Sequence, residues 1–225
     1  MSTVHLVRSD VASLASEARR RNTDVKSSCE SSLAVLNRLD PLLDLSSPEI
    51  GLLIDEKDTI VRPFLISIID GNVKFATISI PVLHRLISGH VVVPELLPTL
   101  VHNLKEASHL GADIQLRILQ CLPSIMQSYG DSIHGDLLMY ILNICTALST
   151  NNKSTVVINT ALATLQQLFR FVFESIKNDK LLLNSKADHE LILANDQKIE
   201  VSSISYEGFM ILSDLTSLAL GDKNI

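Results

Sequence analysis

The sequence contains no tryptophan, and aromatic residues occupy only 4% of its 225 positions. Leucine, isoleucine and valine are abundant instead, so hydrophobic residues still reach 46%. A sandwich or barrel built on aromatic cross-strand pairs is therefore disfavoured, and an aliphatic core of helices packed on helices is favoured. A chain of this length suffices for one large domain or two small ones and can bury a substantial core.

Positive charge is also scarce, with 19 lysines and arginines against 25 aspartates and glutamates, a formal net charge of −6. Broad electrostatic binding of nucleic acid needs clustered lysine and arginine, so we expect no nucleic-acid partner. The one cationic cluster consists of Arg19, Arg20, Arg21 and Lys26. Its first interpretation is a helix C-terminus matched to the helix dipole, and its alternative is contact with anionic lipid or an acidic partner.

Cysteine is rare and unpatterned. Cys29, Cys121 and Cys145 form an odd set without CxxC spacing, and each falls inside a helical pattern. Buried thiols in a reducing compartment explain this set better than a disulfide or a zinc site. The N-terminus lacks the apolar segment of a signal peptide, and no run approaches the roughly 18 apolar residues that span a bilayer. We therefore expect a soluble, cytoplasmic protein.

Signatures of catalysis are missing as well. There is no Gly-rich phosphate loop, no pair of catalytic carboxylates and no Cys-His signature. Residues 130–132, Gly-Asp-Ser, resemble the start of one esterase motif, but such a serine follows a strand and helical sequence precedes this one. His102, Glu106 and His109, at i, i+4 and i+7, share one predicted helix face that could bind a metal, although a solvated surface helix is favoured. We therefore predict no enzyme, no cofactor and no metal site.

The longest uninterrupted helical pattern covers residues 155–176. Its apolar residues recur at i, i+3, i+4 and i+7, which predicts a helix of about six turns. We expect Leu165, Phe169, Val172 and Phe173 to be buried against a neighbouring layer, because an exposed stripe of this size would leave a large apolar face in water.

The opposite face of the same predicted helix is polar and carries Asn159, Gln166 and Arg170. Arg170 combines a fixed charge with a planar guanidinium that suits an acidic or carbonyl-rich surface. A solvated face without a partner is the alternative. Inner helices of helical-repeat proteins present such residues to a binding surface, so these three residues are the candidate partner-binding site.

A regular succession of helical blocks precedes this helix. Two patterns, 4–21 and 25–39, predict an N-terminal pair, and further blocks begin near residues 54, 73, 94, 113, 136 and 155. A step of about twenty residues gives a helix pair about every forty, close to the roughly 40 to 47 residues of armadillo or HEAT units. We therefore predict an all-α, right-handed armadillo- or HEAT-like α-solenoid without a sheet, in which Pro81 and Pro123 kink their helices.

The C-terminal part of the chain departs from this regular succession of helical blocks. Residues 178–203 show neither helical nor strand periodicity over a useful length, which predicts a mobile linker that is dispensable for folding. Helical spacing returns in residues 204–221, ending at Gly221. The expected organisation is a helical-repeat domain over 1–177, the linker, and a C-terminal helix that packs on the solenoid or leads to a following domain.

Five segments carry a resemblance in their order and spacing: SDVASLASEARRRNTDVKSSCESS from Ser9, VRPFLISII from Val61, LHRLISGHVV from Leu83, NTALATLQQLFRFVFE from Asn159 and EGFMILSDLTSL from Glu207. Together they resemble the N-terminal dimerisation and cyclophilin-binding domain of the large Sec-seven-type Arf exchange factor group. The basic stretch after the first helix is most similar to the Mon-two branch of that group.

The resemblance implies an armadillo-like scaffold domain on trans-Golgi and endosomal membranes, peripherally bound and without exchange activity of its own. It implies a homodimer, contact with the adjoining homology domain and recruitment by an Arf-like small GTPase. For the Mon-two branch it also implies a Dopey-family protein and an aminophospholipid flippase as partners. Two alternatives remain open: the regulatory N-terminal domain of a true Arf guanine-nucleotide exchange factor, and an unrelated peptide-binding α-solenoid adaptor.

Overall fold

The computed structural model describes residues 3–18, 22–45, 47, 54–182, 189–192 and 197–220, with side chains described except in 178–182 and 214–220. The α-helices in these ranges are α1 (Thr3–Ala18), α2 (Thr23–Leu36), α4 (Lys57–Ile69), α5 (Val73–Ser88), α6 (Leu97–Ala107), α7 (Ala112–Tyr129), α8 (Gly135–Thr150), α9 (Thr155–Leu182) and α10 (Ser203–Leu220). Two short 3₁₀ helices, η1 (Pro94–Leu96) and η2 (Gly130–Ser132), precede α6 and follow α7.

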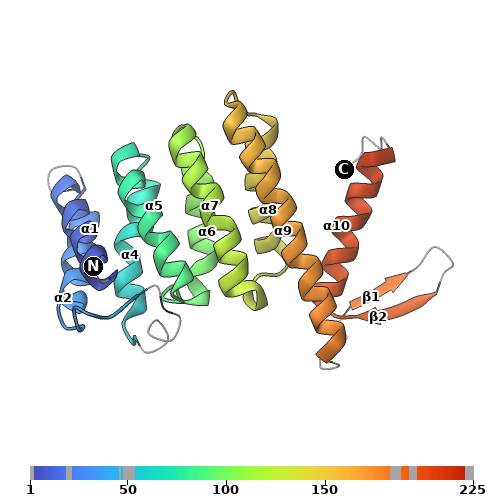
Figure 1. The fold of residues 1–225 in the computed structure, drawn as a ribbon, viewed down its shortest axis with the longest axis horizontal. Helices are drawn as coiled ribbons and strands as arrows, with labels where there is room; N and C mark the ends of the chain where they lie inside the picture. The colour runs from blue at the N-terminus through green and yellow to red at the C-terminus, as the bar shows by residue number, and fades with distance from the viewer. Residues whose placement is uncertain are drawn as a thin grey trace.

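The helices form two layers. One layer runs α1, α5, α7, α9, and the other runs α2, α4, α6, α8, with each helix in contact with its neighbour in the layer (Figure 1). Contacts between α1 and α2, α4 and α5, and α8 and α9 join the layers. This arrangement of helix pairs stacked on helix pairs confirms the predicted all-α, armadillo- or HEAT-like repeat fold.

Local sequence fixes where the helices begin. Asn22 and Asn72 stand before α2 and α5, and their side-chain oxygens accept backbone N–H groups of the first turn, with the bond to Lys74 at 2.9 Å. Asparagine is favoured there because the first N–H groups of a helix have no partner within it. Before α7, Gly111 takes φ +119°, which a residue with a Cβ rarely adopts. The predicted starts near 73, 94, 113, 136 and 155 all lie within three residues of the observed ones.

Prolines lie inside three of the stacked helices, as the sequence predicts for Pro81 in α5 and Pro123 in α7; Pro63 lies in α4. Each removes one backbone N–H donor from its helix. Near two of these sites, the His84 Nε2 and Ser124 Oγ atoms are 2.8 Å apart, which joins α5 to α7. Partial burial lowers the pKa of His84, because it penalises the charged ring.

The core is a continuous aliphatic cluster that extends between the two layers from α1 to α9 and includes Ile211 of α10. Phe64 and Phe75 are the largest side chains in it that are completely buried. Cys29, Cys121 and Cys145 are buried and unbridged, as the sequence predicts. A small polar contact lies within the core, where the hydroxyls of Ser67 and Ser79 meet between α4 and α5.

Helix α9 is longer than predicted and less completely covered. Val172 is buried as expected, but Leu165, Phe169 and Phe173 are only partly buried against the core, so the expectation of full burial is wrong for these three. The reason is geometric. Helices α7 and α8 cover one side of α9, whereas α10 contacts it at one end and diverges from it at the other (Figure 1).

The same helix corrects the expectation about membrane spans. Residues Thr155–Lys177 are long and apolar enough to cross a bilayer by length and composition alone. Buried core helices meet the same criterion. Because α9 packs against α7, α8 and α10 and carries polar residues such as Asn159 and Gln166 on its exposed face, we interpret it as a helix of the stack.

The region expected to be a linker contains regular structure. Helix α9 continues to Leu182, and strands β1 (His189–Ile192) and β2 (Lys198–Val201) pair antiparallel, with His189 opposite Val201. The expectation of no sheet is therefore wrong. The hairpin projects beside the base of α10, where the His189 and Tyr206 rings stack with centroids 4.7 Å apart (Figure 1). That residues 178–203 are dispensable for folding stays a prediction.

Candidate interaction surface

The three α9 residues singled out from the sequence lie together on the outer side of the helix. Asn159, Gln166 and Arg170 are all exposed, and Ala163 completes the row at spacings of three and four residues. Their neighbours toward the core, such as Leu168, are buried. The structure thus places these residues on one solvent-facing stripe of the layer formed by α1, α5, α7 and α9.

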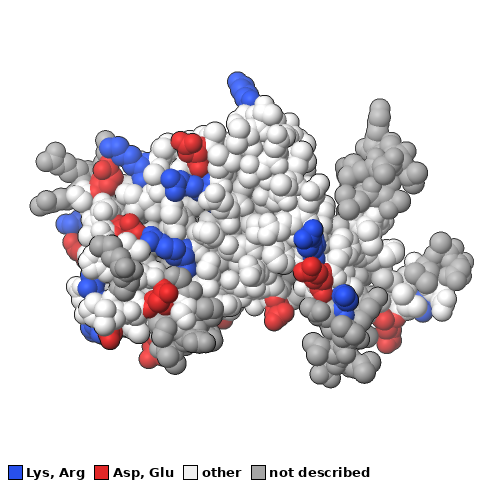
Figure 2. Space-filling view, in the orientation of Figure 1, with Lys and Arg blue, Asp and Glu red and all other residues white. Residues whose placement is uncertain are grey.

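A shortage of charge extends over most of the α8–α9 hairpin. From Leu137 to Phe169 the only charged residue is Lys153, in the turn between the helices, although charged residues make up 20% of the chain. On the α9 side the exposed residues are uncharged up to Arg170. Figure 2 shows this face: charged side chains gather over the N-terminal helices and near the far end of α9, and the surface between them is mostly uncharged.

Beyond Asp136 in its first turn, the α8 side of the hairpin also lacks charge and is more apolar. Met139 and Tyr140 expose 44% and 45% of their surface, and Asn143 follows them one turn on. Exposed apolar residues beside each other indicate a contact surface more strongly than single ones do. The α8–α9 hairpin therefore presents two faces of low charge, one in each layer, with Asp136 at the start of α8 as the exception on the α8 side.

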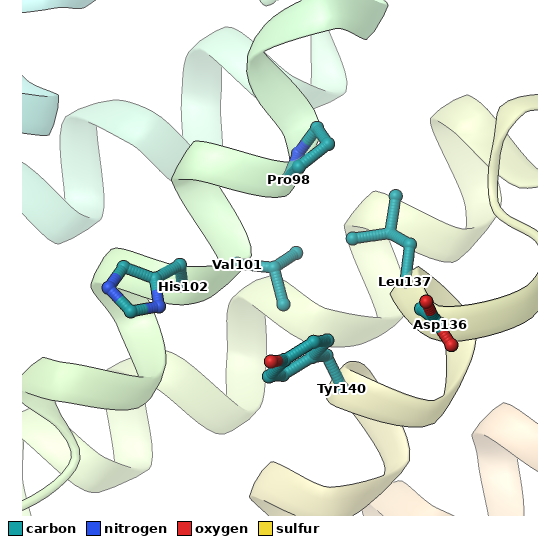
Figure 3. Close-up of a pocket in the computed structure, with 6 residues that line it drawn as sticks. All are labelled: Pro98, Val101, His102, Asp136, Leu137 and Tyr140. Carbon is teal, nitrogen blue, oxygen red and sulfur yellow. The ribbon is translucent and has the colours of Figure 1, made fainter.

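A hollow of about 320 Å³ opens between α6 and α8. Val101 and Leu137 face each other across it, Pro98 lies at one end and Tyr140 at the other (Figure 3). The Lys105 ammonium lies 4.9 Å from the centre of the Tyr140 ring, a cation–π contact that holds the ring at the rim. The remaining lining residues are His102 and Asp136.

A second hollow, of about 290 Å³, lies on the other side of α8, against α10. Its lining includes Leu138 and Met139 from α8 and Met210 and Ile211 from α10, and it shares Asp136 with the first hollow. Both hollows are mostly apolar and open beside the exposed residues of α8. Their volumes lie at the lower end of the range of ligand pockets, and each has room for one large side chain.

Helix α10 is attached to the start of α8 by Glu207. Its carboxylate accepts the backbone N–H of Gly135, a favourable position for an anion at a helix N-terminus, and lies 3.7 Å from His134 Nδ1. The other ring nitrogen of His134 is 2.8 Å from the Asp131 carbonyl, which only an N–H can satisfy, so Nε2 is the donor. Sequence spacing could not show this pair, because more than seventy residues separate its members.

The cationic cluster lies elsewhere. Lys26 is in the first turn of α2, at the opposite end of the stack from α9, and pairs with Glu30 at 3.5 Å. Arg19, Arg20 and Arg21 lie outside the described residues. Lys26 and the α9 residues therefore cannot belong to one compact site.

The described residues do not support the candidate metal site or the esterase-like motif considered from the sequence. Helix α6 ends at Ala107, so His109 is not on a common helix face with His102 and Glu106 as predicted, and no group of three or more metal-binding side chains occurs in the described ranges. Gly130–Ser132 forms η2 directly after α7, without the strand that an esterase nucleophile requires.

Comparison with known proteins gives the family. Residues 1–180 match the family described as the Mon2/Sec7/BIG1-like dimerisation and cyclophilin-binding domain. The chain belongs to this family. The resemblance noted from the sequence is thereby confirmed, and the alternative of an unrelated solenoid adaptor is excluded. The domain's name records dimerisation and cyclophilin binding, both of which are protein–protein interactions rather than reactions.

Individual relatives point to both branches of the family. Protein MON2 of Saccharomyces cerevisiae is 29% identical over 93% of this chain, and the MON2 homolog of Schizosaccharomyces pombe is 29% identical over 84%. Brefeldin A-inhibited guanine nucleotide-exchange protein 4 of Arabidopsis thaliana is 27% identical over 86%. The chain spans only 11–12% of the length of these relatives.

Proposed function

We propose that this domain is a non-catalytic scaffold of a Golgi–endosome trafficking protein, bound peripherally to the membrane. Its proposed roles are self-association and recruitment by an Arf-like small GTPase through the exposed stripe of α9. Contacts with the adjoining homology domain, a Dopey-family protein and an aminophospholipid flippase belong to the same proposal and rest on the family resemblance.

The observation that carries the proposal is the scarcity of charge between Leu137 and Phe169 in an acidic chain. Two copies of a chain with net charge −6 repel each other, so they approach most favourably through a face without charge. Depletion of charge at the centre of the contact is also what distinguishes protein interfaces from ordinary surface. The row from Asn159 to Gln166 supplies hydrogen-bonding groups on this face, and Arg170 at its edge supplies one charge for an acidic partner.

The test is the double variant Gln166→Ala with Arg170→Glu. Both residues are exposed, so the fold should be retained, as circular dichroism can establish. We expect a shift toward monomer in sedimentation velocity and weaker capture of the domain by a GTP-locked Arf-like GTPase. Unchanged sedimentation and unchanged capture would place the partner site elsewhere, and the basic segment from Arg19 to Lys26 would be examined next.

A matched control makes the same charge change in the other layer. Arg62 is an exposed residue of α4 that pairs with Asp58 at 2.7 Å, and Arg62→Glu also shifts the net charge by −2. If this control weakened self-association as much as the double variant does, electrostatic repulsion between more negatively charged copies would explain both results. The α9 stripe would then no longer be assigned as the self-association site.

The second candidate is the regulatory N-terminal domain of a true Arf exchange factor, because the Arabidopsis relative is named as a guanine nucleotide-exchange protein. The two candidates predict the same surface on this domain and differ in the remainder of the protein. Nucleotide-exchange assays on the full-length protein with Arf loaded with a fluorescent GDP analogue would separate them. Accelerated release would favour the exchange factor.

A further inference from the structure

The exposed ridge of α8 has one apolar hollow on each side. Asp136, Met139, Tyr140 and Asn143 form the ridge, and all four are exposed. Residues of α8 that line the hollow toward α6 lie on one flank of this ridge, and those that line the hollow toward α10 lie on the other. Asp136 lines both, so this residue lies between the two hollows.

The spacing of the hollows matches one face of an α-helix. Packed helices lie roughly 8–10 Å apart, so two hollows on either side of α8 are separated by about that distance. A helix that crosses α8 would present residues i and i+7 about 10 Å apart on the same face. One apolar side chain could therefore enter each hollow while the helix backbone crosses over Asp136.

The charge between the hollows defines the partner further. Asp136 has no ion-pair partner within the described part of the chain, and Glu207, in the wall of the second hollow, is turned toward Gly135 and His134. Lys105 is placed over the Tyr140 ring instead of beside Asp136. A helix crossing the ridge would gain from a basic residue at i+3 or i+4, which lies midway between its two anchors.

We propose that the α8 ridge and its two hollows are the docking site for a basic amphipathic helix of a partner protein. The partner has large apolar residues at i and i+7 and lysine or arginine at i+3 or i+4. This site lies in the layer of α2, α4, α6 and α8, opposite the α9 stripe, and does not depend on the function proposed for that stripe. A second copy of this acidic chain fits less well, because it would bring further negative charge toward Asp136.

The test uses three alanine-based helical peptides of equal length with a fluorescent label. The first has leucine at i and i+7 and lysine at i+4; the second replaces the lysine by glutamate; the third moves the second leucine to i+5, on another face. Fluorescence anisotropy with the purified domain should show binding of the first peptide. The second and third should bind about tenfold more weakly or not at all.

Charge reversal on the domain supplies the decisive comparison. Asp136→Lys should weaken the lysine peptide about tenfold and reverse the preference in favour of the glutamate peptide. Asp113→Lys is the matched control, because Asp113 is likewise the second residue of its helix and exposed, but lies in α7 in the other layer. It should leave both affinities unchanged, and circular dichroism should show both variants folded.

Several results would overturn the proposal. They are no binding of the lysine peptide, equal binding of all three peptides, and equal effects of Asp136→Lys and Asp113→Lys. If Asp136→Lys instead altered the sedimentation of the domain alone while no peptide bound, the ridge would be a contact between copies of this chain. If the domain bound vesicles containing anionic lipid but none of the peptides, the proposal of a helix-docking site would be wrong, and the domain would bind a membrane instead of a partner helix.

Discussion

The hydroxyl oxygens of Ser67 and Ser79 lie 2.7 Å apart at the junction of α4 and α5, where both residues are completely buried. Ser67 donates its own proton to the carbonyl of Phe64 at 2.9 Å. A hydroxyl has one proton to donate, so the hydrogen between the two serines comes from Ser79. The two serines form a short chain of hydrogen bonds that ends at a backbone carbonyl of α4.

This chain of hydrogen bonds predicts that mutations of the two serines have non-additive effects on the free energy of unfolding. Ser67→Ala should cost about 1–3 kcal/mol, because it leaves the buried hydroxyl of Ser79 without an acceptor. Adding Ser79→Ala removes that unpaired group, so the double variant should be less destabilised than the sum of the single variants. Urea titrations of the four proteins give the comparison. Strict additivity would show that the two hydroxyls do not depend on each other.

Burial predicts that two phenylalanines contribute unequally to stability. Phe75 is fully enclosed in α5, so Phe75→Ala should lower the free energy of unfolding by about 3–5 kcal/mol. Phe169 in α9 is only partly buried, and we expect its replacement by alanine to cost about half as much. Equilibrium unfolding in urea measures both. A cost for Phe169→Ala equal to that for Phe75→Ala would mean that α9 is covered more fully than the structure shows.

The three thiols predict a loss of stability in alkali. Burial raises the pKa of Cys29, Cys121 and Cys145 to about 12, whereas a thiol in the unfolded chain ionises near pH 9. Below pH 9 neither state ionises and the stability is fully present. Between about pH 9 and 12 the unfolded state loses protons first, so stability falls, by up to about 1.4 kcal/mol per pH unit for each thiol.

The control for this prediction is the variant with all three cysteines changed to alanine. It is less stable at neutral pH, but its stability should fall less steeply above pH 9, because only the remaining groups titrate. Native protein at pH 8 should also react with iodoacetamide far more slowly than protein in urea. Equal alkaline slopes for the two proteins, or fast native labelling, would contradict the burial of these thiols.

The helix starts could be predicted from the sequence because they depend on neighbouring residues. Asn72 caps α5 through the backbone two residues on, and Gly111 supplies a conformation that begins α7; both are local signals. The end of α6 is harder to predict from the sequence, because its last residue, Ala107, is followed by polar residues that a helix also accepts. The assignment of His109 to that helix failed for this reason.

The remaining differences have non-local causes. Strands of four residues, such as His189–Ile192, are too short to establish a period of two, and only Leu191 on β1 is buried. The partial exposure of Phe169 depends on how far α10 diverges from α9. The two hollows beside α8 depend on the separation of helices, which sequence spacing does not encode. The lack of charge from Leu137 to Phe169, in contrast, is visible in the sequence and was the available signal for this surface.

The contacts between helices that are close in sequence also have a consequence for how fast the chain folds. Most helices in contact are adjacent along the described chain or two apart; the main exception is the pair α1 and α5, which are three helices apart. Closing short loops costs little entropy, and domains dominated by near-sequence contacts reach their native topology rapidly. Any helical hairpin can serve as the first structured unit, and the next helix adds to the face that it exposes. The chain can therefore assemble progressively from either end or from the middle, without first bringing its termini together.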